Sequence, residues 1–507
     1  MESRLQAKSF APGAFHLKAG PHARCDKPRD GVLLIISDAL VAQRSLTNQQ
    51  KESSRLLKLT FLKALTKPIQ SVIALASPTT ASAGAASALW TFPSVLGSAM
   101  LIAWAAEAAQ FLVSQGLALA ILAWLQTLPE FAVEAVIAWQ AGETVRSSTN
   151  VFEIQHATAL MTANFTGSLR LLVGLGWPMI YVTAATFYRR QSRRRLREIR
   201  LEREHAVEVV FLFICIAYFV IVWWKGTLTL LDTALLSLIY GVYLYFLNKI
   251  PPQGEEKIED MDRIPRFILR QRAALRNAII VGLFVSGGMI LYFTAHPFLD
   301  SLKAIAVGLG LSTFVFVQWV APFLSEFPEK VSAFNWARRV TMAPLALMNM
   351  VSSNINQWTM LVAMLPIAYA LALGQLGVIT FDEHQRLEIL MTIGQSLLGA
   401  VLLANMRFSW WEALLLFALW LVQFALSGFE APAVVMPGMS AHNSLATRLA
   451  AALAMNVEQV ETLAHRGKLI ITASYFAWVS ITVALAFKRR NVFAAFSIFR
   501  KLMREHR

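Results

Sequence analysis

The chain has 507 residues, of which 56% are hydrophobic and only 15% are charged. A soluble protein carries about 25% charged residues, so this composition excludes an ordinary soluble domain and predicts a helical membrane protein. The net charge of +15 would suggest nucleic acid as the partner of a soluble protein. Here the basic residues lie between apolar segments, where they set membrane topology. We therefore expect a lipid bilayer, and no nucleic acid, as the partner of this chain.

Residues 1–90 form a basic, low-complexity N-terminal extension. Its second part, residues 71–88, is rich in Ala, Ser and Thr and carries no charge. This stretch has the composition of a linker, but the basic run before it also fits a signal-like segment or a start codon placed too far upstream. No function is inferred from it.

Eleven apolar segments follow, and a segment of about 20 such residues is long enough to cross a bilayer. They are predicted at 92–112, 115–140, 156–187, 206–224, 228–248, 277–295, 302–327, 341–373, 388–405, 408–427 and 468–487. The first ten form two sets of five on either side of a charged link. An odd number of spans per set inserts the second set upside down relative to the first. The predicted fold class is an all-α polytopic membrane protein with two inverted five-helix repeats, ten core helices and one extra C-terminal transmembrane helix.

The chain then divides into five parts. They are an N-terminal extension (1–90), a first repeat (91–249), a cytoplasmic linker (250–276), a second repeat (277–427) and a C-terminal part (428–507) with an extramembrane loop, the extra helix and a basic tail.

Charged loops give the orientation. The link 188–204 holds eight arginines and three glutamates, and the tail 488–507 holds seven Lys or Arg and one Glu. Lys and Arg accumulate on the cytoplasmic side, so both segments are predicted there. Counting spans back places the N-terminus outside although it is basic. An undetected span in 68–90, or a misplaced start, would remove this conflict.

Two short polar stretches occur once in each half. Residues 127–130 (Thr-Leu-Pro-Glu) and 326–329 (Glu-Phe-Pro-Glu) place a carboxylate directly after a proline inside an apolar segment. The proline frees a backbone carbonyl. An acid in the bilayer centre costs about 2.5–3.5 kcal/mol, so it needs a partner or a function. Carboxylate and carbonyl oxygens are the ligands that hard cations prefer.

A second polar stretch follows each copy of the first, at 164–168 (Asn-Phe-Thr-Gly-Ser) and 349–353 (Asn-Met-Val-Ser-Ser). Its amides and hydroxyls add further oxygens. A polar pair that recurs in two halves of a membrane protein is typical of a transporter with inverted repeats.

These stretches resemble the hallmarks of the sodium/calcium exchanger superfamily of calcium/cation antiporters, Gly-Thr-Ser-Leu-Pro-Glu and Gly-Asn-x-x-Gly-Ser-Asn-Ile-Phe-Asn. The resemblance covers residues 95–427. It implies ten core helices, alternating access, and two central glutamates, Glu130 and Glu329, that coordinate Ca²⁺ or Na⁺ in turn. The other cation ligands that it implies are Thr127, Ser168, Ser325 and Ser353. The supporting residues are Asn164, Asn349, Asn354, Gln126, Glu326, Gln357 and Arg170.

The sequence departs from the family pattern at several of these positions. Leu172 and Gln357 stand where the last asparagine of the second hallmark is expected, and Leu169 replaces an earlier one. Arg170 stands where an apolar residue is expected. An arginine at that depth should be paired, and the expected partners are the glutamates at 130, 326 and 329. Arg170 would then occupy the place of a cation. Alternatively, the helix is rotated and the arginine reaches water.

The predicted function is secondary active cation antiport, in which Ca²⁺ or another cation moves against Na⁺ or H⁺. The alternative is a non-transporting or proton-coupled relative, a sensor or scaffold, with Arg170 in the cation site. An enzyme is disfavoured, because no nucleophile, nucleotide loop or His-rich cluster accompanies the acids. No cofactor is expected, and the oligomeric state is left open. The predicted location is the bacterial inner (plasma) membrane. The weaker site candidates are Glu107, Glu134, His156 and Lys330.

Overall fold

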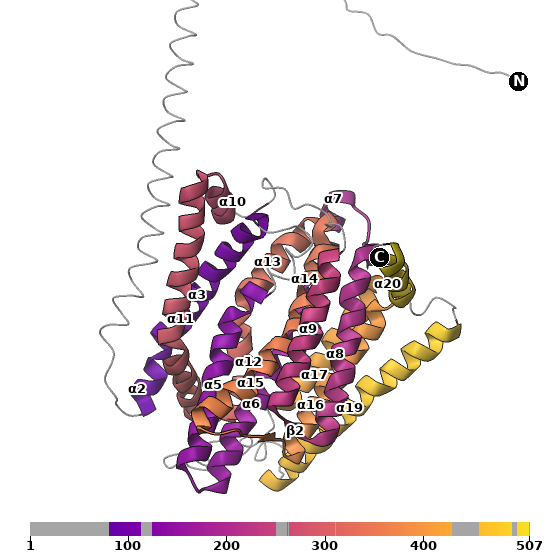
Figure 1. Cartoon of the computed structure of the whole chain (residues 1–507). Coiled ribbons are helices and arrows are strands. Elements are labelled where there is room, and N and C mark those ends of the chain that lie inside the picture. Colours follow the sequence, from indigo (N-terminus) through magenta and orange to yellow (C-terminus); the bar gives the residue numbers. More distant parts are fainter. Residues whose placement is uncertain are drawn as a thin grey trace, which may run out of the picture. The chain divides into compact units, whose positions relative to one another are not determined.

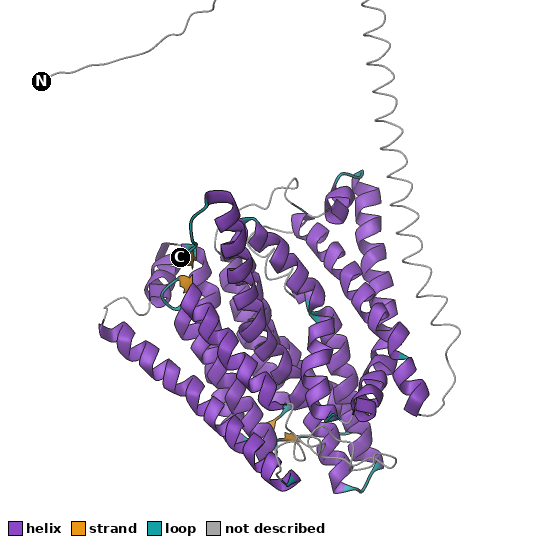
Figure 2. Ribbon diagram, turned by 180° about the vertical axis from the view of Figure 1, so that it is seen from behind, coloured by secondary structure: helices purple, strands orange, loops and turns teal. Residues whose placement is uncertain are grey.

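The computed structural model describes residues 81–112, 124–249, 261, 263–309, 311–427, 456–488 and 494–505. The predictions for the first 80 residues, for 250–260 in the linker and for the loop 428–455 lie outside the described residues. In the parts that are described, nearly all residues are helical and the strands are very short (Figures 1 and 2).

The elements follow the two predicted repeats. The first contains α2 (Ala81–Ala86), α3 (Ala88–Ala109), η1 (Gln110–Leu112), α5 (Leu128–Ser147), α6 (Val151–Leu171), η2 (Leu172–Gly176), α7 (Trp177–Ser192), β1 (Glu198–Arg200), η3 (Arg203–His205), α8 (Ala206–Lys225), β2 (Thr227–Leu228) and α9 (Leu230–Lys249). The second contains α10 (Arg263–Leu269), α11 (Ala273–Leu309), α12 (Thr313–Ser325), α13 (Phe327–Arg338), η5 (Val340–Met342), α14 (Ala343–Asn356), η6 (Gln357–Leu361), α15 (Val362–Leu373), β3 (Ile379–Thr380), α16 (Glu383–Leu403), β4 (Arg407–Ser409) and α17 (Trp410–Ser427). The C-terminal part contains α19 (Val457–Lys488) and α20 (Ala494–Glu505).

Nine helical segments among the described residues are long and apolar enough to cross a membrane. Two further crossings are broken and carry the Pro-Glu stretches: the segment 124–147, and the pair α12 and α13. Together these segments give the ten core helices and the extra helix, α19, that the sequence predicts. The fold class is confirmed.

The boundary between the sixth and seventh predicted spans was wrong. The sequence predicts one span at 277–295 and another at 302–327, separated near Pro297. Instead, α11 continues through Pro297 as one helix of 37 residues, and the next helix begins at Thr313 after Ser312. A proline is tolerated inside a transmembrane helix because neighbouring groups can satisfy the freed carbonyl. At 1.5 Å per residue, α11 is about 55 Å long, well above the bilayer core of about 30 Å.

Two pairs of short strands show the inverted relation of the repeats. β1 precedes α8 and pairs antiparallel with β4, which follows α16. β2 follows α8 and pairs with β3, which precedes α16. The adjacent helices α8 and α16 are therefore joined at both ends and run in opposite directions. This is the arrangement expected of equivalent helices in inverted repeats.

The Arg-rich link and the C-terminal tail lie at the same end of the molecule, as predicted (Figure 1). Arg203 in η3 forms an ion pair of 3.4 Å with Glu505 in α20. α20 packs on α8, where its buried side chains are Ala495 and Leu502. Both basic segments therefore lie on one side of the bundle, which agrees with the prediction that they share one side of the membrane.

Gly167, in the second polar stretch, allows α6 to cross α12 closely. A Cβ atom on Gly167 would lie 1.8 Å from the backbone oxygen of Gln318, so a side chain would push the two helices apart. We expect Gly167→Ala to destabilise the fold by about 3 kcal/mol, the upper part of the overpacking range. The measurement is the melting temperature of the purified protein in detergent. Gly97→Ala is the matched control, since no atom lies within 4 Å of its added Cβ. An unchanged melting temperature for Gly167→Ala would contradict the close crossing.

Candidate functional site

Both Pro-Glu stretches lie at the start of a helix that resumes after a break. A helical turn at residues 124–126 ends at Thr127, and α5 begins with its proline in the first turn. In the second repeat, α12 ends, Glu326 forms the break, and α13 begins in the same way. Proline fits the first turn because its missing N–H would have no intrahelical partner there. Glu130 and Glu329 thus lie in first turns, where free N–H groups and the helix dipole favour negative charge.

The second polar stretch also has the same local structure in both repeats. A single π-helical turn follows it at 172–176 in the first repeat and at 357–361 in the second. Such turns are rare and often occur at functional sites, because they leave the regular pattern of backbone hydrogen bonds. The positions of the two departures, Leu172 and Gln357, are the first residues of these turns. The irregular backbone therefore lies where the sequence predicts ligands.

Gln357 connects acids of the two repeats in the protein interior. Its amide nitrogen Nε2 donates to Glu130 at 2.8 Å and to Glu326 at 3.0 Å. All three side chains are at most 2% exposed. Glu326 also pairs with Lys330 in the first part of α13, so this lysine lies inside the protein. The glutamine that replaces the family's asparagine at position 357 therefore donates hydrogen bonds to two of the buried acids.

Glu329 differs from Glu130 in its contacts. It is fully buried, and neither carboxylate oxygen has a hydrogen-bond partner among the described residues. A buried carboxylate without a partner is costly. An anion in this state requires a cation or a proton, which makes Glu329 the strongest ligand candidate of the site.

The other predicted site residues are all buried, and several link the repeats. Asn356 of α14 donates to the Thr127 hydroxyl at 2.6 Å. Asn349 donates to Gln126 at 3.3 Å, and Asn354 donates to the backbone oxygen of Leu169 at 3.4 Å. Ser168, Ser325 and Ser353 supply further buried hydroxyls. Within the described ranges, no group of three or more His, Cys, Asp or Glu side chains has the arrangement of a metal site. A cation here would be bound mainly by hydroxyl, amide and carbonyl oxygens around two acids.

A family model described as a sodium/calcium exchanger protein matches residues 83–249 and 279–429. The chain belongs to the sodium/calcium exchanger family. The resemblance found in the two polar stretches is confirmed, and the protein is an integral membrane protein of a transporter family. A comparison with curated proteins gives no match.

Several solved structures are similar to this chain. The H⁺/Ca²⁺ exchanger CAX is 26% identical, with a TM-score of 0.70, over 88% of this chain and 98% of that one. The protein YfkE is 15% identical, with a TM-score of 0.47, over 67% and 92% of the two chains. The sodium-calcium exchanger NCX_Mj is 18% identical, with a TM-score of 0.43, over 68% and 99%.

In this exchanger, the prediction that Arg170 pairs with Glu130, Glu326 or Glu329 was wrong. Its guanidinium pairs with Glu388 of α16 at 2.7 Å. It also donates to the backbone oxygen of Thr166 at 3.0 Å. The alternative that the arginine reaches water is wrong too, since its side chain is 1% exposed. Arg170 therefore does not replace a cation between the central glutamates.

Glu388 was not predicted as a site residue, and it joins three elements outside the central cluster. Gln318 of α12 donates at 3.0 Å to the same oxygen, Oε2, that pairs with Arg170. The other oxygen, Oε1, forms an ion pair of 2.6 Å with Lys468 of α19. Trp319 covers the Arg170 guanidinium at 5.2 Å. α19 lies beyond both ranges matched by the family model. The extra helix is thus tied to the core by a buried triad of Arg170, Glu388 and Lys468.

Two of the weaker candidates extend the polar region towards opposite ends of the bundle. Asn164 donates to buried Glu134 of α5. Glu107 of α3 accepts from Ser332 at 2.6 Å, and Gln126 donates to the same serine at 3.5 Å. Both acids therefore face the bundle interior and connect to residues of the candidate site.

Proposed function

We propose that this protein is a secondary antiporter that exchanges Ca²⁺, or a divalent cation like it, against protons by alternating access. The observation that carries the proposal is the pair of buried glutamates, Glu130 and Glu329, each in the first turn of a helix that restarts in the middle of its repeat. Freed carbonyls, hydroxyls and amides surround them. Hard cations prefer these oxygen ligands, and inverted repeats place such a site midway across the membrane.

The charge of the cluster favours a divalent cation. Three carboxylates, Glu130, Glu326 and Glu329, lie with one ammonium group, Lys330. Their formal sum is two negative charges, which Ca²⁺ would neutralise. When the cation leaves, two protons on the central glutamates would restore the same balance. The cost of isolated charge in a low-dielectric interior makes one of these two states necessary at each stage.

Two further observations support protons rather than Na⁺ as the counter-ion. Leu169 and Leu172 remove two oxygen ligands that the family pattern supplies, and a Na⁺ ion needs a cage of oxygens whereas a proton needs one. The H⁺/Ca²⁺ exchanger CAX also shares 26% identity over almost its whole length. The ligand roles of Thr127, Ser168, Ser325 and Ser353 belong to this proposal, as does a place in the bacterial inner membrane.

The test uses the full-length protein reconstituted in liposomes. A proton gradient, with Na⁺ absent, should drive uptake of ⁴⁵Ca²⁺, and dissipating the gradient with a protonophore should stop it. A Na⁺ gradient at uniform pH should drive no uptake. Uptake that follows the Na⁺ gradient would overturn proton coupling, and uptake under neither gradient would overturn Ca²⁺ antiport itself.

A further inference from the structure

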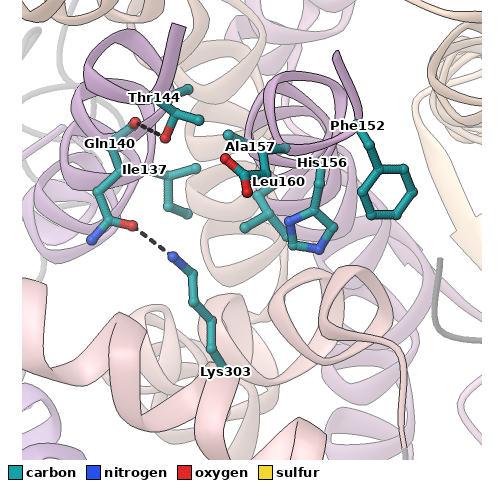
Figure 3. Close-up of a pocket in the computed structure, with 10 residues that line it drawn as sticks. Ile137, Gln140, Thr144, Phe152, His156, Ala157, Leu160 and Lys303 are labelled. Carbon is teal, nitrogen blue, oxygen red and sulfur yellow. Dashed lines mark hydrogen bonds between the residues drawn. The ribbon is translucent and has the colours of Figure 1, made fainter. Parts of the chain in front are cut away.

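A cavity lies between α5, α6 and α11 (Figure 3). The turn between α5 and α6 lies at the end of the bundle opposite the Arg-rich link (Figure 1). Its volume is about 320 Å³, and its walls include Ile137 and Gln140 of α5, His156 and Leu160 of α6, and Lys303 of α11. Because the positive-inside rule predicts the Arg-rich link on the cytoplasmic side, this cavity is predicted on the outer side.

The lining side chains become more buried with depth. Glu153, near the start of α6, is exposed, and His156 one turn later is half-buried. Ile137 and Leu160 are at most 3% exposed. The cavity is therefore open to water at the turn between α5 and α6 and closes on an apolar floor.

One helical turn beneath that floor lies the pair Glu134 and Asn164. Glu134 precedes Ile137 by one turn on α5, and Asn164 follows Leu160 by one turn on α6. The Asn164 amide donates to one carboxylate oxygen of Glu134. Glu134 Oε1 and Asn164 Oδ1 have no partner within the described part of the chain, although both side chains are at most 1% exposed. Glu130 follows one turn deeper on the same face of α5.

The chemistry of this pair fits a proton better than a metal ion. Ca²⁺ takes about 6–8 oxygen ligands, whereas Glu134 and Asn164 offer two oxygens without partners. The ammonium group of Lys303, held by Gln140 at 2.7 Å, also lies in the cavity wall and repels a divalent cation. A proton needs only one acceptor oxygen, and the opposite charges of Glu153 and Lys303 do not exclude it from cavity water.

We propose that Glu134 is a proton carrier between the outer cavity and Glu130. In a state of the transport cycle that admits cavity water past Ile137 and Leu160, its free oxygen Oε1 takes a proton from hydronium, leaving water. It later gives that proton to the Glu130 carboxylate, and the reverse steps release it. No other bond changes. Asn164 is a positioning residue, because its amide holds the other carboxylate oxygen of Glu134. This inference rests on the proposed proton-coupled exchange.

The test compares two modes of transport in reconstituted liposomes. Proton-driven ⁴⁵Ca²⁺ uptake requires proton movement, whereas exchange of ⁴⁵Ca²⁺ for unlabelled Ca²⁺ at uniform pH does not. In Glu134→Gln we expect proton-driven uptake to fall about tenfold or more, in line with the loss of a positioned proton-transfer group, and calcium self-exchange to stay unchanged. Glu134→Asp should restore part of the proton-driven rate. Glu143→Gln, a few turns along the same helix and outside the cavity wall, should behave as wild type.

Each other outcome identifies what failed. If Glu134→Gln lowers both modes equally, Glu134 binds the cation or supports the fold, and the proton role is wrong. If neither mode changes, Glu134 is not on the path. A wild-type protein that self-exchanges calcium but shows no proton-driven uptake would overturn the proposed coupling ion, and the carrier role with it.

Discussion

Glu329→Gln should abolish calcium exchange while the protein still folds. The substitution keeps the shape of the side chain but removes the one central carboxylate that has no hydrogen-bond partner in the described chain. Loss of a ligand charge weakens a calcium site by about 100-fold or more. We expect no measurable ⁴⁵Ca²⁺ uptake in liposomes at calcium concentrations that saturate the wild type. Glu130→Gln should give a similar loss, although its amide could keep one contact with Gln357.

The control for this prediction is Glu383→Gln, which removes an exposed carboxylate at the start of α16. Its transport should equal that of the wild type. Melting temperatures of all variants should lie close together, because removing an unpartnered buried charge does not destabilise the fold. Normal uptake by Glu329→Gln would remove the central ligand from the proposal.

Glu388→Gln should be among the most destabilising substitutions in the chain. The carboxylate separates two buried cations, Arg170 and Lys468, at 2.7 and 2.6 Å. Removing it leaves both without their counter-charge, and breaking a buried ion pair in this way costs about 3–5 kcal/mol. We expect low yield and a much lower melting temperature in detergent.

The matched variant Lys468→Met tests the same triad by removing one of its two cations instead of the carboxylate. It leaves Arg170 and Glu388 as a neutral pair, so its melting temperature should fall far less. The double variant Glu388→Gln with Lys468→Met should recover part of the loss, because only one buried cation then remains unpaired. Equal effects of the two single variants would show that the triad is not organised around Glu388.

Much of the membrane architecture could be predicted because few structures satisfy backbone hydrogen bonds in lipid. Apolar length predicts the crossings, and the repeated Pro-Glu stretches predict where two of them break. The same reasoning placed Glu130, Glu329 and their polar neighbours in one buried region. The π-helical turns at 172–176 and 357–361 had no signal in the pattern, since their hydrogen-bond shift depends on packing.

The predicted positions of Glu388 and Lys468 within their helices were wrong for the same physical reason. Glu388 and Lys468 each stand at the edge of an apolar window, so both were taken as the first residues of their spans. In the structure α16 begins at Glu383, and the Asp382 side chain accepts from the backbone N–H of Gln385 at 2.8 Å. α19 begins at Val457. A charged residue one or more turns inside a membrane helix can be buried when it pairs with an opposite charge. The pattern of a single sequence does not show which distant residue supplies that charge. The cap at Asp382 was the signal that would have moved the boundary of α16.

The strand pairs at both ends of α8 and α16 bear on how a site in mid-membrane opens to one side at a time. Because β1–β4 and β2–β3 fasten these two helices at each membrane face, sliding one along the other would break backbone hydrogen bonds at both ends. We therefore expect α8 and α16 to act as a fixed frame. We expect the movement that opens the site to one side at a time to occur in helices that no strand pair joins. The main candidates are α3 and α11, which lie side by side (Figures 1 and 2). A disulfide between α8 and α16 should leave exchange intact, whereas one between α11 and the frame should arrest it.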